Sequence, residues 1–289
     1  MTEATRPSIR LEHIHLEHDG DVAIITLDNP GRRNALSRPM QEGLVALIAE
    51  VRRSPGVRAV LLTAAGNAFC AGADLVSNGI PPGDEHLTRG QSTRKVMMEM
   101  SNPIISQLRD LPVPIVCALP GVCAGAGIGI ALAADVVIAA RSASFYLPFM
   151  HRLGIVPDLG TSWFMEKLAG RARATALTLL GDRLPAEKAE QWGVIWSCVD
   201  DAVLRESALA VAHRLARLPA HAALETRRCY EAASHSGLDA QMQYEADRQA
   251  ELIDLPAFDE GVRAFLEKRE PDFSRAAAPT TNTNQGDTA

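Results

Sequence analysis

No stretch of this 289-residue sequence is long and apolar enough to cross a membrane, which takes roughly 20 residues. The N-terminus, M-T-E-A-T-R-P, also lacks the apolar region of a signal peptide. Positive charge is not in excess, because the formal net charge is -6, and this argues against nucleic acid as a partner. We therefore expect a cytoplasmic protein with no membrane or nucleic-acid partner.

Motifs that pair cysteines are absent as well. None of the five cysteines belongs to a C-x-x-C pair, and three of them sit in apolar surroundings that suit a small buried hydrophobe, so free thiols are expected. His13, His15 and His18 lie close together but lack cysteine or carboxylate partners at ligand spacing. We expect His13 and His15 to share one face of a strand, and a solvated strand face is favoured over a metal site.

Strand and helix patterns alternate through the first two thirds of the chain. The composition, 47% hydrophobic and 22% charged, is ordinary for a globular protein. Two strand-then-helix units predict an α/β layer structure whose sheet is built at least partly from crossovers, whereas beyond about Asp200 only helices are predicted. We expect an α/β core over 1–200, a helical region over 201–272 and a disordered tail over 273–289.

Individual elements are predicted from periodicity, caps and turn residues. Residues 9–28 are typical of two strands joined at Asp19-Gly20, and Ser37 is the expected N-cap of a helix over 38–53. The other predicted strands are 57–63, 114–119, 136–140 and 144–147, and the other predicted helices are 86–109, 202–217, 220–234, 238–252 and 257–268.

The most unusual stretch is the glycine-rich segment 120–135, P-G-V-C-A-G-A-G-I-G-I-A-L-A-A-D, which follows an apolar strand and opens a helix. A dinucleotide-binding fingerprint does not fit, because Ile130 stands where the third glycine belongs and Asp135 comes too early for a ribose ligand. Two interpretations remain: a small-residue helix packed closely on a sheet, or an oxyanion hole in which Ala126 N–H is one donor. The second interpretation needs another donor from elsewhere in the chain.

A loop of small residues, 66–75, offers that donor, since it follows a predicted strand and allows close backbone approach beside Gly72. Three motifs, A-F-C-A-G-A-D-L at 68–75, the glycine-rich segment, and G-I-V-P-D at 154–158, together resemble the crotonase (enoyl-CoA hydratase/isomerase) superfamily. Their order and spacing match this family over residues 10–270.

The resemblance implies a crotonase-like spiral of ββα units, followed by a C-terminal all-helical region that mediates homotrimers, often paired into homohexamers. It also implies an acyl-CoA thioester substrate whose carbonyl is held by two backbone N–H groups, by position those of Ala73 and Ala126. Family members often have glycine at the second position, but alanine keeps the N–H. No separate cofactor is expected, because coenzyme A enters as part of the substrate.

Contacts to coenzyme A are also implied by the resemblance. The segments 33–36 and 71–74 match stretches that cradle the adenine and pantetheine, largely through backbone. Arg32, Arg33, Lys268 and Arg269 are basic groups that could meet the phosphates, the last two from a neighbouring subunit. The predicted coenzyme-binding residues are Arg33, Asn34, Ala35, Leu36, Ala71, Gly72, Asp74 and Lys268.

The two glutamates of the family's hydratases are missing. The first position is Gly129, and the second falls on Phe149 or Met150, neither of which can give a proton. Adding water to a double bond needs a base for the water and an acid for the α-carbon, so ordinary hydratase activity should be weak or absent.

One carboxylate remains at a position that the family uses for chemistry. Asp158 matches the acid of the enoyl-CoA isomerases and of the ring-epoxide isomerase branch, although it could instead cap a helix that begins near Gly160. For Asp74 and Asp135, structural roles are favoured.

The sequence therefore predicts an acyl-CoA-processing enzyme, with double-bond isomerisation as the first hypothesis and Asp158 as the base. A hydratase that uses Asp158, His151, Asp84 or Glu85 is one alternative, and a catalytically silent acyl-CoA-binding protein is another.

Overall fold

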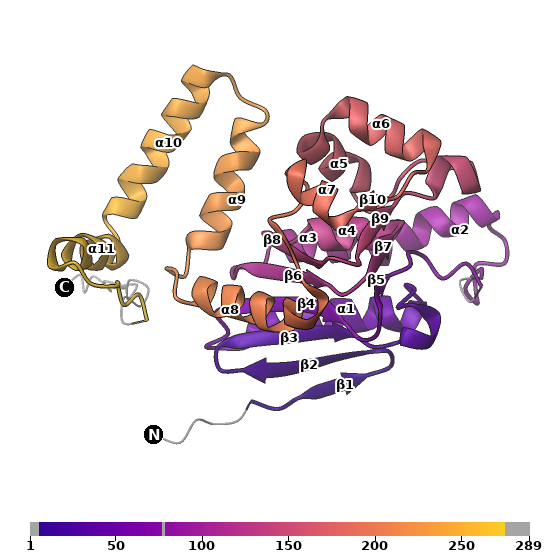
Figure 1. Cartoon of the computed structure of the whole chain (residues 1–289), viewed down its shortest axis with the longest axis horizontal. Coiled ribbons are helices and arrows are strands. Elements are labelled where there is room, and N and C mark those ends of the chain that lie inside the picture. Colours follow the sequence, from indigo (N-terminus) through magenta and orange to yellow (C-terminus); the bar gives the residue numbers. More distant parts are fainter. Residues whose placement is uncertain (1–5, 77–78, 275–289) are drawn as a thin grey trace, which may run out of the picture. The chain divides into compact units, whose positions relative to one another are not determined.

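The computed structural model describes residues 6–76 and 79–274 of the chain (Figure 1). They fall into two compact units, which divide the chain at Ala216 and Arg217. The first unit mixes strands and helices, whereas the second is helical. The α/β class predicted from the sequence is confirmed, and each unit is described by itself below.

A seven-stranded sheet forms the centre of the first unit, in the order β1-β2-β3-β4-β6-β8-β11. The strands β1 to β3 pair antiparallel, and from β3 onward every neighbouring pair is parallel. Parallel pairing requires the chain to return by a crossover between strands, as the strand-then-helix pattern predicted. The bounds are β1 Ile9–Leu11, β2 Ile14–Asp19, β3 Val22–Leu27, β4 Ala59–Ala64, β6 Ile115–Leu119, β8 Val136–Ala140 and β11 Ser197–Val199.

A second, four-stranded sheet has the order β10-β9-β7-β5. Three of its strands each follow a strand of the large sheet within a few residues: β5 (Ala68–Cys70) follows β4, β7 (Val122–Ala124) follows β6, and β9 (Ser144–Tyr146) follows β8. Each such strand pair is followed by a helix, so the unit repeats strand, strand, helix. This is the spiral of ββα units that the family resemblance implied. Strand β10 (Leu184–Pro185) completes the small sheet.

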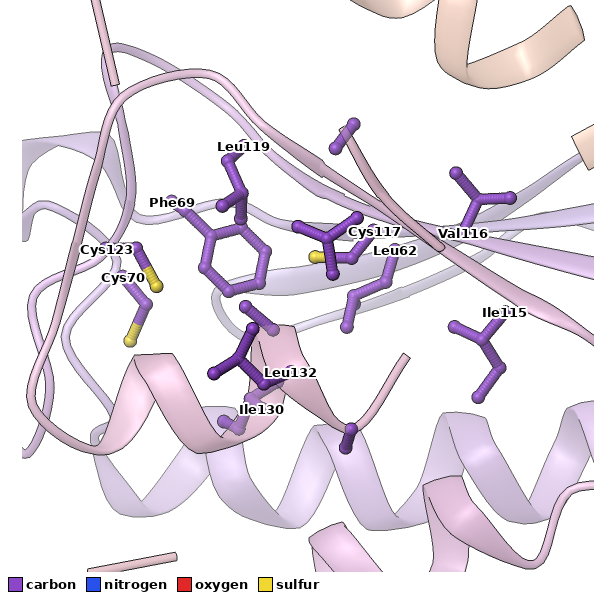
Figure 2. Close-up of a cluster of buried hydrophobic side chains, with 14 of the residues drawn as sticks. Leu62, Phe69, Cys70, Ile115, Val116, Cys117, Leu119, Cys123, Ile130 and Leu132 are labelled. Carbon is purple, nitrogen blue, oxygen red and sulfur yellow. The ribbon is translucent and has the colours of Figure 1, made fainter. Parts of the chain in front are cut away.

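The helices of the first unit supply one wall of the core. In α1 (Arg38–Arg53) the residues Met40, Leu44 and Val51 are buried at helical spacing, and the side chain of Ser37 accepts a hydrogen bond from the Met40 N–H, as predicted. Figure 2 shows the apolar side chains of the large sheet and of α4 meeting in this core. The other helices are α2 Arg89–Val96, α3 Asn102–Arg109, α4 Ala126–Leu132, α5 Thr161–Ala169, α6 Arg171–Leu180, α7 Ala186–Gln191 and α8 Leu204–Ala216.

Two predicted elements differ from the observed ones. The helix expected over 86–109 begins at Arg89 and contains a π-helical turn, Met97–Ser101, before α3. Pro103 explains this turn, because proline has no N–H to donate to the carbonyl four residues earlier. The first predicted strand is interrupted at His13, whose φ of 66° ends β1, so His13 and His15 do not share a strand face. Within 6–76 and 79–274, no group of three or more potential ligands could hold a metal ion.

The second unit contains α9 (Ala222–Ala233), α10 (Leu238–Ile253) and α11 (Pro256–Glu267). The predicted disordered tail, 273–289, lies almost wholly outside the described residues. None of the described helices has the length and apolarity needed to cross a membrane.

Candidate active site

The first loop of the site follows strand β5. Gly72 has a φ of +90°, a conformation that side chains rarely adopt, and its carbonyl accepts a hydrogen bond of 2.8 Å from Leu36 N–H. Ala71 N–H donates to the carbonyl of Arg33 at 3.0 Å. These bonds fasten the 71–74 loop to the 33–36 segment, so the structure brings together the two stretches predicted to cradle coenzyme A.

The second loop is the glycine-rich turn between β7 and α4. Gly125 has φ +53° and ψ -131°, and its N–H donates to the carbonyl of Tyr146 at 3.0 Å. Helix α4 then begins at Ala126, whose N–H belongs to the first turn and has no carbonyl partner within the helix. The turn therefore presents Ala126 N–H at a helix N-terminus, where negative charge is favoured.

The two loops touch each other. A β-carbon built on Gly72 would lie 3.3 Å from Gly125 Cα and 3.4 Å from Ala126 N, so only glycine allows this approach without strain. The backbone N–H groups of Ala73 and Ala126 donate to no other residue of the described chain. Two uncommitted N–H donors on abutting loops are the components of an oxyanion hole.

Asp158 lies between the π-helical turn Phe149–Leu153 and α5. Burial raises the pKa of its carboxyl group from 3.8 to about 6. Its Oδ1 atom is buried and has no hydrogen-bond partner among the described residues. The N-cap of α5 is Gly160, without a side-chain cap, so Asp158 does not take the capping role that its sequence context also allowed.

Gly129 explains why a glutamate cannot stand at the first hydratase position of this chain. A β-carbon built on Gly129 would overlap the carbonyl oxygen of Leu159. Leu159 itself has a φ of +45°, a strained value for a leucine, and is 5% exposed. The backbone after Asp158 thus packs directly on α4. Sequence reasoning missed this contact, because no local pattern reports a close approach between segments 30 residues apart.

The second hydratase position holds no acid in the structure either. Phe149 is buried in the core and Met150 is 39% exposed. His151, a candidate for a second acid or base, has Nε2 2.9 Å from the hydroxyl of Tyr146. Its ring also packs on Gly181, where an added β-carbon would overlap it. These contacts fix the orientation of the His151 ring, and its Nδ1 atom is buried without a hydrogen-bond partner among the described residues.

The acids of the 79–100 region are engaged in local interactions. Asp84 is 7% exposed and pairs with Lys95, with 2.7 Å between Oδ1 and Nζ. Glu85 accepts the Gly83 N–H with both carboxylate oxygens, and this bond lowers the pKa of Glu85. A lowered pKa makes Glu85 a poor candidate for a base near neutral pH, and the Asp84 side chain is engaged by Lys95.

The side chains of two predicted coenzyme-binding residues, Asn34 and Asp74, are engaged within the protein. Buried Asn34 uses its side chain locally, since it accepts from Asn29 N–H and donates to the carbonyls of Ala65 and Ala68. Asp74 pairs with Arg32 at 2.8 Å, which ties that arginine to the 71–74 loop.

The other basic candidates are placed differently. Arg33 is exposed beside the loop, with a φ of +50°. Lys268, the C-cap of α11, belongs to the second unit, and Arg269 is paired there with Glu260 and Glu267. Asp135, expected to be structural, accepts the Ile115 N–H at 2.7 Å.

A family model described as Enoyl-CoA hydratase/isomerase matches residues 17–276. The chain belongs to the enoyl-CoA hydratase/isomerase family. Members of this family act on acyl-CoA thioesters, and the crotonase resemblance found in the motifs is thereby confirmed.

Relatives of this protein include one named as an isomerase and one named as a hydratase. The 1,2-epoxyphenylacetyl-CoA isomerase of Escherichia coli is 39% identical over 264 residues, which cover 91% of this chain and 99% of that protein. A Rhodobacter capsulatus protein named "Probable enoyl-CoA hydratase" is 39% identical over 261 residues, 90% of this chain and 97% of its own.

A solved structure shows the same fold. The enoyl-CoA hydratase from Bacillus anthracis has a TM-score of 0.79 at 29% identity, over 90% of this chain and 98% of that one. The family and the fold are therefore established, and the choice of reaction depends on the groups that this chain places around the two loops.

Proposed function

We propose that the protein isomerises acyl-CoA thioesters through an enolate, with double-bond migration in a 3-enoyl-CoA as the primary reaction. The observation that carries this proposal is the carboxyl group of Asp158, whose Oδ1 atom is buried without a hydrogen-bond partner among the described residues and whose pKa is raised to about 6. Both hydratase acids are absent, and the backbone of Leu159 lies where a side chain on Gly129 would have to go. Isomerisation needs one acid/base group, whereas hydration needs two.

In the proposed reaction, Asp158 first accepts a proton and later returns it, and the two N–H donors stabilise the intermediate between these steps. Asp158 takes a proton from C2 of the 3-enoyl thioester, and the electron pair moves into the carbonyl to form a dienolate. The N–H groups of Ala73 and Ala126 hold the charged oxygen; one such donor is worth about 3 to 4 kcal/mol of transition-state stabilisation. The protonated Asp158 then returns its proton at C4, the carbonyl reforms, and the double bond lies between C2 and C3.

The test is the turnover of a 3-enoyl-CoA by Asp158→Asn. We expect a loss of at least about 100-fold in kcat, since the amide cannot accept the proton. Asp110→Asn, the same change at an exposed carboxylate at the end of α3, should keep the activity of the parent protein. Unchanged turnover by Asp158→Asn would remove Asp158 from the mechanism.

Hydration is the second candidate, because one of the 39% identical relatives carries that name. Incorporation of ¹⁸O from labelled water into the product, at the rate of turnover, would favour it. Tight binding of acyl-CoA esters without turnover of any enoyl-, hydroxyacyl- or dicarbonyl-CoA would instead favour a silent binding protein.

A ring-epoxide substrate is a variant of the isomerase proposal. The Escherichia coli relative, a 1,2-epoxyphenylacetyl-CoA isomerase by name, supports it. A buried acid with a raised pKa could also protonate or orient an epoxide oxygen beside the oxyanion hole. Comparing kcat/KM for an aryl-epoxide thioester and a 3-enoyl-CoA decides between the two.

We further propose that coenzyme A is bound as part of the substrate by the 33–36 and 71–74 segments, and that the protein assembles into homotrimers or homohexamers. The second unit supports assembly, because Phe265 and Leu266 are 83% and 74% exposed. They help line an apolar cavity of about 550 Å³ formed within that unit. Exposed apolar side chains of this size are typical of contact surfaces.

A further inference from the structure

We propose that Cys70 is a positioning residue of the oxyanion hole: its thiol helps to set the orientation of the first donor, and the residue borders the helix turn that carries the second. The inference rests on the proposed function, because it concerns the donors Ala73 and Ala126. Cys70 ends strand β5, is fully buried, and contacts both loops of the site. Figure 2 shows it beside Cys123 at one end of the apolar cluster.

The first contact is a hydrogen bond from Gly72 N–H to Cys70 Sγ, 3.4 Å long. The Gly72 carbonyl is held on the other side by Leu36 N–H. The two peptide groups that flank the Gly72 α-carbon are thus each fixed by one bond. Because a trans peptide is planar, its N–H points opposite to its carbonyl, so fixing the Gly72 carbonyl directs the Ala73 N–H away from Leu36.

The hydrogen bond to Cys70 Sγ restrains Gly72, which matters because a glycine backbone has access to more φ and ψ values than other residues. Without the thiol, the Gly72 N–H would have no hydrogen-bond acceptor among the described residues. The loop would then sample other values of φ and ψ at Gly72, and the Ala73 N–H would spend less time in the position that binds the thioester oxygen.

The second contact is with the first turn of α4. A β-carbon built on Gly127 would lie 2.7 Å from Cys70 Cβ and 3.0 Å from both its Sγ and its carbonyl oxygen. Gly127 directly follows the donor Ala126, so the helix start rests on the Cys70 side chain. Cys70 therefore borders the helix turn that carries the second donor, through its backbone carbonyl as well as its side chain.

The thiol remains neutral in this position. Burial, with a smaller contribution from the negative charge of Asp158, raises the pKa of Cys70 to about 12. A neutral sulfur can accept the weak bond from Gly72 without opposing the charge on the substrate oxygen. The same interaction indicates that Cys70 lies within electrostatic range of the proposed base.

The test compares Cys70→Ala and Cys70→Ser with Cys117→Ala. Cys117 in β6 is equally buried and also has a raised pKa, but its thiol makes no hydrogen bond to either loop among the described residues, so it controls for the loss of a buried thiol. The primary readout is the infrared C=O stretch of bound, ¹³C-labelled butyryl-CoA, which falls when two N–H donors polarise the thioester. Thermal unfolding and kcat and KM with a 3-enoyl-CoA complete the comparison.

We expect both alanine variants to lower the melting temperature, whereas only Cys70→Ala should move the C=O stretch toward its value in free butyryl-CoA. The same variant should lower kcat about tenfold with KM nearly unchanged, since misaligned donors affect the transition state most. Cys70→Ser, which keeps a hydrogen-bond acceptor, should restore part of the C=O shift and part of kcat. Equal effects of Cys70→Ala and Cys117→Ala on the stretch would overturn the proposal.

The same measurements separate failure of the proposed isomerase function from failure of the positioning role of Cys70. If the parent protein polarises bound butyryl-CoA but does not turn over any 3-enoyl-CoA, isomerisation is wrong and the positioning role of Cys70 still stands on the spectra. If the bound thioester is not polarised in the parent protein, there is no oxyanion hole for Cys70 to position, and the inference fails.

Discussion

At the residue scale, the Asp158 carboxyl group combines burial with an absence of partners for Oδ1 in the described chain. A carboxylate in such a place is poorly solvated, so it holds a proton more strongly than an exposed aspartate does. A raised pKa also makes the carboxylate a stronger base once it is ionised. The same burial that costs stability therefore prepares the group for proton transfer near neutral pH.

The pH dependence of activity follows from this pKa. Asp158 must be ionised to take a proton, so kcat/KM for a 3-enoyl-CoA should fall as the pH drops through about 6. An ordinary aspartate would keep its activity down to about pH 4. A pH-rate profile of the parent protein measures the midpoint; a profile that is flat down to pH 4.5 would contradict the assignment.

The free energy of unfolding should depend on pH in the opposite sense to the activity, so that it falls as the pH rises. The pKa of Asp158 is higher in the folded than in the unfolded protein, so the folded state binds more protons between pH 4 and 6 and loses stability as the pH rises through that window. Asp158→Asn avoids the loss. We expect it to be more stable than the parent by up to about 3 kcal/mol at pH 8 and equal to it at pH 4.

Urea denaturation of both proteins at the two pH values measures this difference. Asp110→Asn should show no such pH-dependent gain, because Asp110 is exposed. A constant difference between Asp158→Asn and the parent across this pH range would count against a perturbed carboxyl group.

Gly129 gives a second prediction at this scale. Gly129→Ala places a methyl group on the Leu159 carbonyl, and a backbone group cannot turn aside as a side chain can. We expect a loss of about 3 kcal/mol in the free energy of unfolding. Gly90→Ala, where nothing lies within 4 Å, is the control and should leave stability equal or slightly higher. Gly129→Glu should likewise destabilise the protein rather than create a hydratase.

At the element scale, the 79–88 segment is fastened to α2 by two interactions. Thr88 and Gln91 form a reciprocal capping box at the start of α2, and Asp84 pairs with Lys95 in the last turn of α2. The Asp84 side chain is only 9% exposed, so removing Lys95 would leave a buried carboxylate without its ion-pair partner.

Lys95→Met should therefore loosen this segment. We expect faster cleavage by a protease within 79–88, because Asp84 would be left without the lysine. Arg94→Met, at the neighbouring exposed position of α2, removes the same charge without touching Asp84 and is the control. Equal cleavage of the two variants would show that the ion pair does not hold the segment.

The elements also show where sequence patterns succeed. Helix α1 was predicted with its bounds and its Ser37 cap, because its apolar spacing and its cap are local signals. The strands β5 and β7 were not predicted as strands. Each has three residues, too few for periodicity, and they pair with each other across more than 50 residues of sequence.

At the scale of the whole molecule, the prediction concerns assembly. Phe265→Glu replaces an 83% exposed phenylalanine of α11 with a charge, and we expect it to reduce the proposed trimer or hexamer to smaller species. Arg263→Ser, at a 63% exposed side chain of the same helix, should leave the assembly intact. Sedimentation velocity measures both; a parent protein that is monomeric at all concentrations would rule out the proposed assembly.

The sequence by itself determined the family, the α/β class with a helical C-terminal region, and the positions of the proposed donors, because these follow from local motifs and their spacing. It also identified Asp158 as the remaining carboxylate. It left open whether that carboxylate caps α5, and it placed no constraint on Cys70. The tertiary structure decided these points: it left Asp158 Oδ1 without a partner, packed Leu159 on Gly129, and set Cys70 against both loops. Such contacts join residues distant in sequence, so only the folded chain brings them together.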